Sequence, residues 1–402
     1  MKREKQLPFW RLRPHPSKGE CRRNFVCLLL LCCWLFCCVP AAAQEDNGLQ
    51  PAYAAQLESS GASALPETLP EDTKRTLGEL GVVGDDFQAV GSLTPQRFFQ
   101  TVFGIAGEQG QGPLKAAAST LAILLLCALV DAMKLSFGER PLEGVVGIVG
   151  ALCVSVVIVN PIVEVLVRAG SVIQSACVFS TASVPVMAGI LAAMGKPASA
   201  ASMQGILTVT GDAVQVLCAQ ILVPMLQALL AMTVVSAISP DVNLGGLLRF
   251  LTKAVKWILG FSMTFFSSLL AMRSFVSAGS DTLAGRAAKF VVSSFVPVVG
   301  SALSEAMRTV TGCVELLRGG VGAFGLLAIL ILFLPSLLSV LLWMLALHAC
   351  SAFAQLFAIS ELQSLFDACV QVLETLLAVL LCSMTVLVVS GVVLMMMGGS
   401  SA

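Results

Sequence analysis

The stretch VGAFGLLAILILFLPSLLSVLLWML, residues 321–345, carries no charged side chain over its whole length. A membrane-spanning helix needs about 20 mainly apolar residues, because the hydrocarbon core offers its backbone groups no water. The stretch therefore predicts a transmembrane helix. Similar stretches recur from Lys115 onward and alternate with short polar breaks, so this pattern decides the fold class.

The composition supports the same conclusion for the whole chain of 402 residues. Hydrophobic residues make up 57% and charged residues 12%, against about 25% charged in an ordinary soluble domain. The mean hydropathy is +0.89. A soluble multidomain enzyme, a disordered scaffold and a disulfide-stapled secreted module are excluded. No basic stripe suggests a nucleic-acid partner, and we expect an all-α polytopic membrane protein.

The first 43 residues have the layout of a signal peptide. They carry 8 basic and 2 acidic side chains, and the apolar run Phe25–Val39 is followed by Pro40 and three alanines. A basic region, a short apolar run and a small-residue site are typical of secretory signals. We expect residues 1–43 to be a signal peptide, cleaved after Ala43; a retained signal anchor is the alternative.

Residues 44–114 differ sharply from the flanking segments. They carry 3 basic and 10 acidic side chains and several prolines. We expect an acidic polar extracytoplasmic segment, with short helices near Lys74–Leu80 and Pro95–Ile105. It would act as a solvated spacer or bind a partner. Residues 115–402 then form a multi-span membrane domain.

The apolar stretches of that domain predict about seven or eight transmembrane helices. The stretch 204–238 is too long for one span, and Pro224 could divide it into two passes. Two passes would also place a following basic cluster inside, as the positive-inside bias requires. The candidate spans are Ala116–Val130, Gly144–Val163, Val172–Met194, Gln204–Ile238, Val255–Ala271, Val321–Leu345 and Thr375–Met397.

One polar face stands out within the apolar body. Gln204, Thr208, Asp212 and Gln215 are spaced so that they share one side of a helix. An ionisable group at membrane depth costs about 2.5–3.5 kcal/mol to insert, so it should face a bundle interior or water. This face is a candidate pore lining, or alternatively a hydrogen-bonded cluster between helices or a position near the interface.

Two further segments are candidates for contact with partners. The first is a cytoplasmic basic loop that contains Arg249, Lys253 and Lys256. The second is an amphipathic helical hairpin at 281–318, whose turn lies between Pro297 and Gly300. It would lie at the membrane interface or dip into the bundle. A plain surface helix is the alternative. The hairpin's other polar or motif residues are Arg286, Lys289, Phe290, Glu305, Arg308, Glu315 and Arg318, and Glu305/Arg308 and Glu315/Arg318 have ion-pair spacing.

Catalytic signatures are missing from the sequence. No Walker A sequence and no His-Glu-x-x-His occur, and the two histidines are His15 and His348. No serine or cysteine has an evident base partner. We therefore expect no enzymatic activity, no metal and no cofactor.

The segment 286–322 carries a family resemblance. Its sequence contains Arg286-Ala-Ala-Lys289-Phe290, FVPVVG at 295–300, Thr309-Val310 and LLRGGVG at 316–322. With the overall layout of signal sequence, polar outer segment and multi-span body, these residues resemble the stage III sporulation protein AE family of endospore-forming bacteria.

This resemblance implies a role in sporulation. Members lie in the mother-cell membrane that surrounds the forespore and belong to a channel or feeding complex that supports late forespore gene expression. Implied partners are products of the same operon, including a secretion-type ATPase and ring-forming membrane proteins, and a forespore channel protein. The alternative is a secondary transporter or permease of small molecules, with Asp212 on its path.

Overall fold

The structure is a computed structural model that describes residues 57–82 except 59, 87–137, 145–194, 197–238, 245–266, 268, 300–357 and 359–396. All regular structure in these ranges is helical, and they contain no strand. The expected all-α fold is therefore confirmed. The predicted signal peptide and most of the first arm and turn of the predicted hairpin lie outside the described residues.

Long helices make up the membrane body. Each apolar segment satisfies its backbone groups within itself, which in lipid only a helix can do. The helices are α4 (Pro95–Phe137), α5 (Val145–Ala193), α6 (Pro197–Val214), the π-helical segment η6 (Gln215–Leu222), α7 (Val223–Ile238), a helix at 245–266, α9 (Gly300–Leu356) and α10 (Ser360–Met396).

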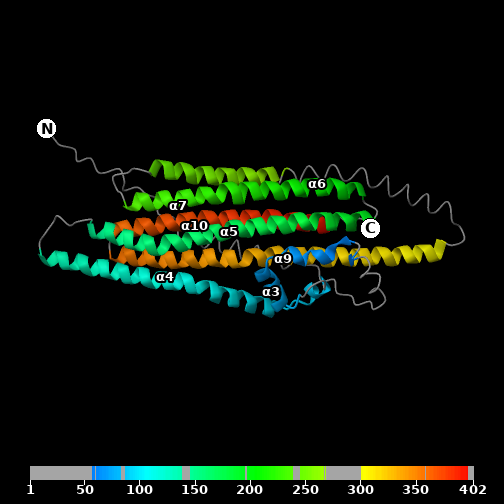
Figure 1. Ribbon diagram of the computed structural model, residues 1–402, viewed down its shortest axis with the longest axis horizontal. Coiled ribbons are helices and arrows are strands. Elements are labelled where there is room, and N and C mark those ends of the chain that lie inside the picture. The colour runs from blue at the N-terminus through cyan, green and yellow to red at the C-terminus, as the bar shows by residue number, and fades with distance from the viewer. Residues whose placement is uncertain are drawn as a thin grey trace, which may run out of the picture. The chain divides into compact units, whose positions relative to one another are not determined.

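These helices lie side by side along one long axis (Figure 1). The α9–α10 pair is packed most extensively, and α5 contacts both of them. Phe333, Phe366 and Leu380 are fully buried at the centre of this packing. Near the α9–α10 turn, the Ser351 hydroxyl donates a 2.8 Å hydrogen bond to Asp367 Oδ1. The core of the molecule is therefore the α5–α9–α10 layer.

α5 corrects one prediction about the spans. The stretches 144–163 and 172–194, predicted as two passes, lie on this single helix of 49 residues. Glu164 and Arg168 lie between these two stretches. They stay helical, and Arg168 Nη1 donates a 3.3 Å hydrogen bond to Gln109 of α4. A polar stretch flanked by helix formers can thus continue the helix rather than reverse it.

The predicted break at Pro224 is also wrong. Helix continues through α6, η6 and α7, and the backbone at Val214 and Val223 is right-handed helical. Pro224 lacks an N–H and its ring crowds the preceding turn. The wider π-helical turns before it, in which the Val223 N–H bonds the Cys218 carbonyl, relieve that crowding. Residues 200–236 are consequently one apolar helix.

The number of spans is lower in the described ranges than predicted. Five helices there are long and apolar enough to cross a membrane: 95–130, 147–193, 200–236, 312–356 and 360–395. The predicted seven or eight is not confirmed. The prediction assumed about 20 residues per pass, whereas these apolar helices have 36–47 residues.

The expected polar spacer contains a folded element. The described residues between 57 and 92 (57–58, 60–82 and 87–92), which we call the cap, contain η2 (Ala62–Ala64), η3 (Pro66–Thr68), α3 (Glu71–Glu79) and η4 (Phe87–Ser92). The expected helix near Lys74–Leu80 is present as α3. It ends at Glu79 with Leu80 as its C-cap, and the next residue, Gly81, has a φ of 89°, which favours glycine. The Val82 N–H bonds the Leu77 carbonyl.

The cap has an apolar core of its own that faces the bundle. Eight apolar side chains among its described residues are nearly inaccessible: Ala62, Leu65, Leu69, Leu77, Leu80, Val82, Phe87 and Val90. Both α3 and η4 contact α9. Residues 95–114, also expected in the polar segment, are instead the first half of α4, which continues through position 114 without a break.

Candidate functional site

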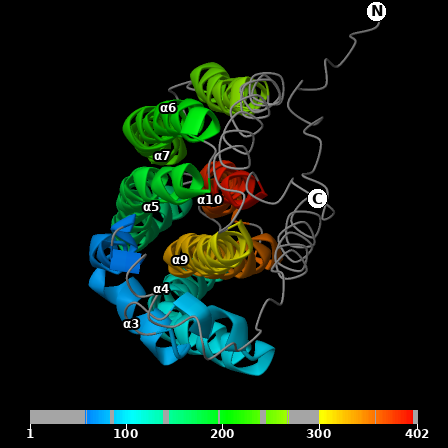
Figure 2. The same ribbon diagram turned by 90° about the vertical axis from the view of Figure 1, so that its right-hand side faces the viewer.

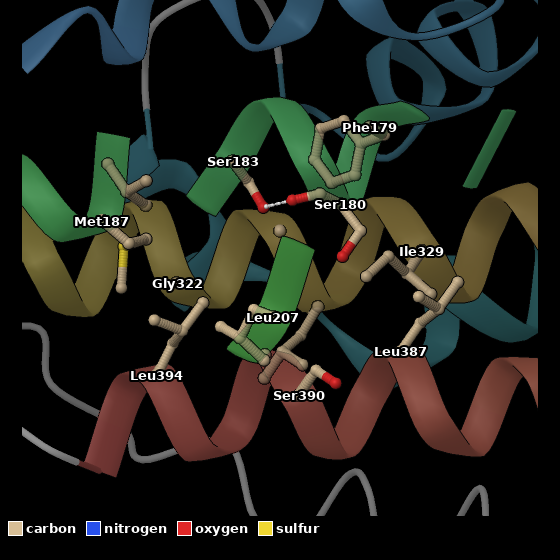
Figure 3. Close-up of a pocket in the computed structure, with 14 residues that line it drawn as sticks. Phe179, Ser180, Ser183, Met187, Leu207, Gly322, Ile329, Leu387, Ser390 and Leu394 are labelled. Atoms are coloured by element: carbon tan, nitrogen blue, oxygen red, sulfur yellow. Dashed lines mark hydrogen bonds between the residues drawn. The ribbon is translucent and has the colours of Figure 1, made fainter. Parts of the chain in front are cut away.

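A small cavity lies where four helices meet. α5 and α6 form one side of it, and α9 and α10 form the other (Figure 3). Its volume is about 30 Å³, which suffices for one water molecule. A pocket that holds a small-molecule ligand is about ten times larger or more. In this conformation the cavity therefore does not hold a transported metabolite.

Three glycines shape this cavity in different ways. A Cβ on Gly391 of α10 would lie 2.9 Å from Leu326 Cδ2, and a Cβ on Gly322 of α9 would collide with Met395. These two glycines permit α9 and α10 to approach closely, as small residues do between helices in lipid. Gly325 has no atom within 4 Å of the position of a Cβ, so it leaves space open.

The hydroxyl groups around the cavity mostly bond to backbone. Ser183 Oγ donates to the Ser180 carbonyl at 2.7 Å (Figure 3), and Ser390 Oγ donates to the Val386 carbonyl at 2.8 Å. These bonds stay within one helix, so they do not hold the helices together. The cavity is a small gap in the helix packing with a slightly polar wall. Its side chains do not present a group of hydrogen-bond donors that converge on one point, as an anion would need.

The polar face predicted on residues 204–215 exists, but Gln204 and Asp212 point outward. Both are exposed, while Thr208 and Gln215 are half-buried. Thr208 Oγ1 donates to the Gln204 carbonyl at 2.9 Å. The expected position in the bundle interior is thus not observed. A role in a pore stays a prediction.

The inward side of α6 explains this orientation. Leu207, Thr210, Gly211, Val214 and Cys218 are buried and follow one helical face. A Cβ on Gly211 would lie 3.1 Å from Thr181 Oγ1 of α5. Small and apolar residues therefore occupy the packed side, and the polar face is rotated away from it.

Arg249, Lys253 and Lys256 lie on a helix and not in a loop. All three are exposed on the helix at 245–266. The prediction of a loop was wrong. The three basic residues lower the hydropathy of the first half of this helix, so the sequence there resembles a polar connection between spans. The helix that carries them follows α7 closely in the chain and begins near the end of the bundle at which α7 ends (Figure 1).

The second arm of the predicted hairpin is the beginning of α9. Gly300 is its first residue, Glu305 and Arg308 follow on the same helix, and no break separates them from 321–345. The expected ion pair between Glu315 and Arg318 does not form. Arg318 Nη1 instead lies 3.9 Å from Met194 Sδ, and its buried Nε has no hydrogen-bond partner. Arg286, Lys289, Phe290 and Pro297 lie outside the described residues.

Sequence reasoning missed the attachment of the cap to the bundle. The rings of Phe87 and Phe324 meet edge to face with centroids 5.0 Å apart, and Phe179 completes the group at 6.4 Å from Phe324. A Cβ on Gly320 would lie 3.2 Å from Phe87 Cβ. The available signal was the recurrence of leucines and one phenylalanine between 65 and 90 in an otherwise polar segment. Phe179 also lines the cavity, so the cap attaches beside it.

Together these features define the protein as an all-α polytopic membrane protein with a folded polar cap seated on its longest helix. Among the described residues, no group of three histidines, cysteines or acidic residues could hold a metal ion. The sequence profile of the family described as stage III sporulation protein AE matches residues 83–398. The chain belongs to this family and is a sporulation membrane protein.

A curated relative from Bacillus subtilis (strain 168), stage III sporulation protein AE, is 23% identical over 263 residues. The match covers 65% of this chain and 64% of the length of that relative. No solved structure matches the chain.

Proposed function

We propose that this chain is a non-enzymatic integral membrane component of the channel or feeding complex that links the mother cell and the forespore. Its place is the mother-cell membrane around the forespore, and its role is to support late forespore gene expression. Membership of the stage III sporulation protein AE family supports this proposal. The long apolar helices suit a membrane scaffold.

The exposed carboxylate of Asp212 is the structural observation that carries the proposal. It lies on a helix that is apolar enough to span the membrane, yet it faces outward from the bundle. Lipid contact would cost about 2.5–3.5 kcal/mol. Contact with another subunit or with a water-filled path removes that cost, which is what assembly into a channel complex supplies.

The partners follow from the same proposal. They are products of the same sporulation operon, including a secretion-type ATPase and ring-forming membrane proteins, and a channel protein from the forespore. The segment 286–318 is the proposed contact for the mother-cell partners. Reversal of Arg286 and Lys289 to Glu should abolish recovery of the complex at an unchanged protein level, and normal recovery would contradict this assignment.

Deletion of the gene in its spore-forming host tests the function. We expect engulfment to be complete and a late forespore reporter to stay silent. Complementation with the wild-type gene should restore the reporter, and complementation with Asp212→Asn should restore it less well. Normal spores after deletion would refute the channel role, and the solute-transport alternative would then be tested with purified protein in liposomes.

A further inference from the structure

The helix at 245–266 has three distinct sides. Its buried side consists of Thr252, Val255, Ser262 and Phe266, each at most 8% exposed. Figure 2 shows the helix at the edge of the bundle beside α7. The two remaining sides are open, and each has a uniform chemistry.

One open side is cationic. Arg249, Lys253 and Lys256 are exposed and fall within an arc of about 60° at 100° per residue. Ion pairs within the described part of the chain join Lys74 to Glu71 and Arg75 to Glu79; none of them neutralises this side. Within the part of the chain that the structure describes, these three positive charges therefore have no ion-pair partner.

The adjacent open side is aromatic. Trp257 and Phe261 stack with ring centroids 5.7 Å apart and planes 10° apart, and Phe265 continues the stack at 6.4 Å and 16°. Trp257 is 71% exposed, and Phe250 on the same side is 66% exposed. The aromatic side occupies an arc of about 80° next to the cationic one.

We infer that this helix is a binding site for anionic phospholipids, with headgroup phosphates on the cationic side and acyl chains against the aromatic stack. Phosphate and acyl chain belong to one lipid molecule, so a lipid satisfies both adjacent sides at once. Tryptophan and basic residues are typical of the membrane interface, and basic clusters beside a membrane segment attract anionic lipids. A water-soluble protein partner would leave the aromatic stack uncovered whenever it dissociated. This site goes beyond the proposed channel role, because it makes the protein sensitive to lipid composition.

Quenching of Trp257 fluorescence by brominated lipids tests the site. The full chain is reconstituted in vesicles of phosphatidylcholine that contain a small fraction of brominated phosphatidylglycerol or brominated phosphatidylcholine. The emission of Trp257 is the difference between the Trp343→Phe protein and the Trp343→Phe/Trp257→Phe protein. We expect brominated phosphatidylglycerol to quench this emission more strongly, and added salt to reduce the difference.

The variant Arg249→Gln/Lys253→Gln/Lys256→Gln should lose the preference for phosphatidylglycerol over phosphatidylcholine. Each charge that is removed should lower this preference about fivefold (about 1 kcal/mol each). The matched control Arg75→Gln/Arg97→Gln/Lys115→Gln carries the same change of charge at exposed positions elsewhere and should keep the preference. Exchange of the three residues for Lys, Arg and Arg should also keep it. Equal quenching by the two lipids would overturn the inference. So would a glutamine variant that keeps its lipid preference but no longer co-purifies with a partner protein.

Discussion

Gly391 and Gly325 lie beside the same cavity and face opposite physical constraints. A methyl group on Gly391 would meet Leu326 Cδ2 at 2.9 Å, whereas one on Gly325 would enter open space. The sequence around them does not show which of the two tolerates a larger side chain, because both are glycines within apolar helices. Only the approach of the neighbouring helix does.

Gly391→Ala should therefore destabilise the protein and Gly325→Ala should not. The methyl group would meet the far end of the Leu326 side chain, which lines the cavity, so the cost should lie near the lower end of the about 1–3 kcal/mol for overpacking. The measurement is the thermal unfolding midpoint of each variant, purified in the same detergent. The Gly391→Ala midpoint should fall by several degrees, and an unchanged midpoint would show that α9 and α10 are less closely packed than described.

Phe87→Ala should release the cap from α9. The Phe87 side chain is 1% exposed, and its ring contacts Phe324. Loss of a buried phenylalanine ring costs about 3–5 kcal/mol. Limited proteolysis should then cleave the cap faster than in the wild type. Phe103→Ala, at a position that is 75% exposed, is the control and should leave the cleavage rate unchanged.

At the scale of the residue, the sequence predicted correctly which polar residues share one side of a helix, but not whether that side faces the bundle or its surroundings. Helical periodicity correctly placed Gln204, Thr208 and Asp212 along one side of a helix. It could not show that this side faces outward. The packed side of α6 contains small residues such as Gly211, and only the position of α5 shows that this glycine lies at a close helix contact. The unpaired state of Arg318 was also out of reach, since i, i+3 spacing permits an ion pair without requiring it.

At the scale of the element, the continuity of α5 is directly testable. Val149 and Val178 are both exposed, and a continuous helix separates them by about 44 Å at 1.5 Å per residue. Two antiparallel passes would bring them much closer together. Spin labels at these positions, in a Cys153→Ser background, should give the long distance by pulsed electron resonance. A distance near 20 Å would restore the interpretation as two spans.

Element existence could be predicted, and element number could not. Every predicted span that lies in described residues coincides with helix. The error came from the assumption that a helix ends when it has crossed the hydrocarbon core. A helix ends where its backbone or its packing forces it to end, and Pro161 and Pro185 are both accommodated within α5.

At the scale of the whole molecule, the bundle is longer than a bilayer is thick. Gly320, which contacts the cap, and Leu356 are 36 residues apart on α9, or about 54 Å. The hydrocarbon core is about 30 Å thick. The cap and the α9–α10 turn should therefore lie on opposite sides of the membrane.

Cysteine labelling checks this arrangement. Glu79→Cys in the cap and Ser360→Cys at the α9–α10 turn are both exposed positions. In intact non-sporulating cells that express the protein in their cell membrane, a membrane-impermeant maleimide should label position 79 and leave position 360 unlabelled until the cells are opened. Labelling of both positions in intact cells would contradict the described end-to-end separation.

The division of the chain into regions was predictable only in part. The contrast between an acidic segment and an apolar body is visible in the sequence. The boundary near residue 114 is not a structural one, because α4 continues through it. Composition marks where the solvent changes, and it says little about whether a polar segment folds back onto its neighbour.

The seating of the cap on α9 has a mechanical consequence. Phe87 holds the cap to α9 close to Gly320, and the same helix runs without interruption to the turn at the far end of the bundle. A force applied to the cap would act along the stretch of α9 from Gly320 to Leu356, which stays helical through Pro335. Tension on one side of the membrane would thus reach the opposite face as a displacement of that turn.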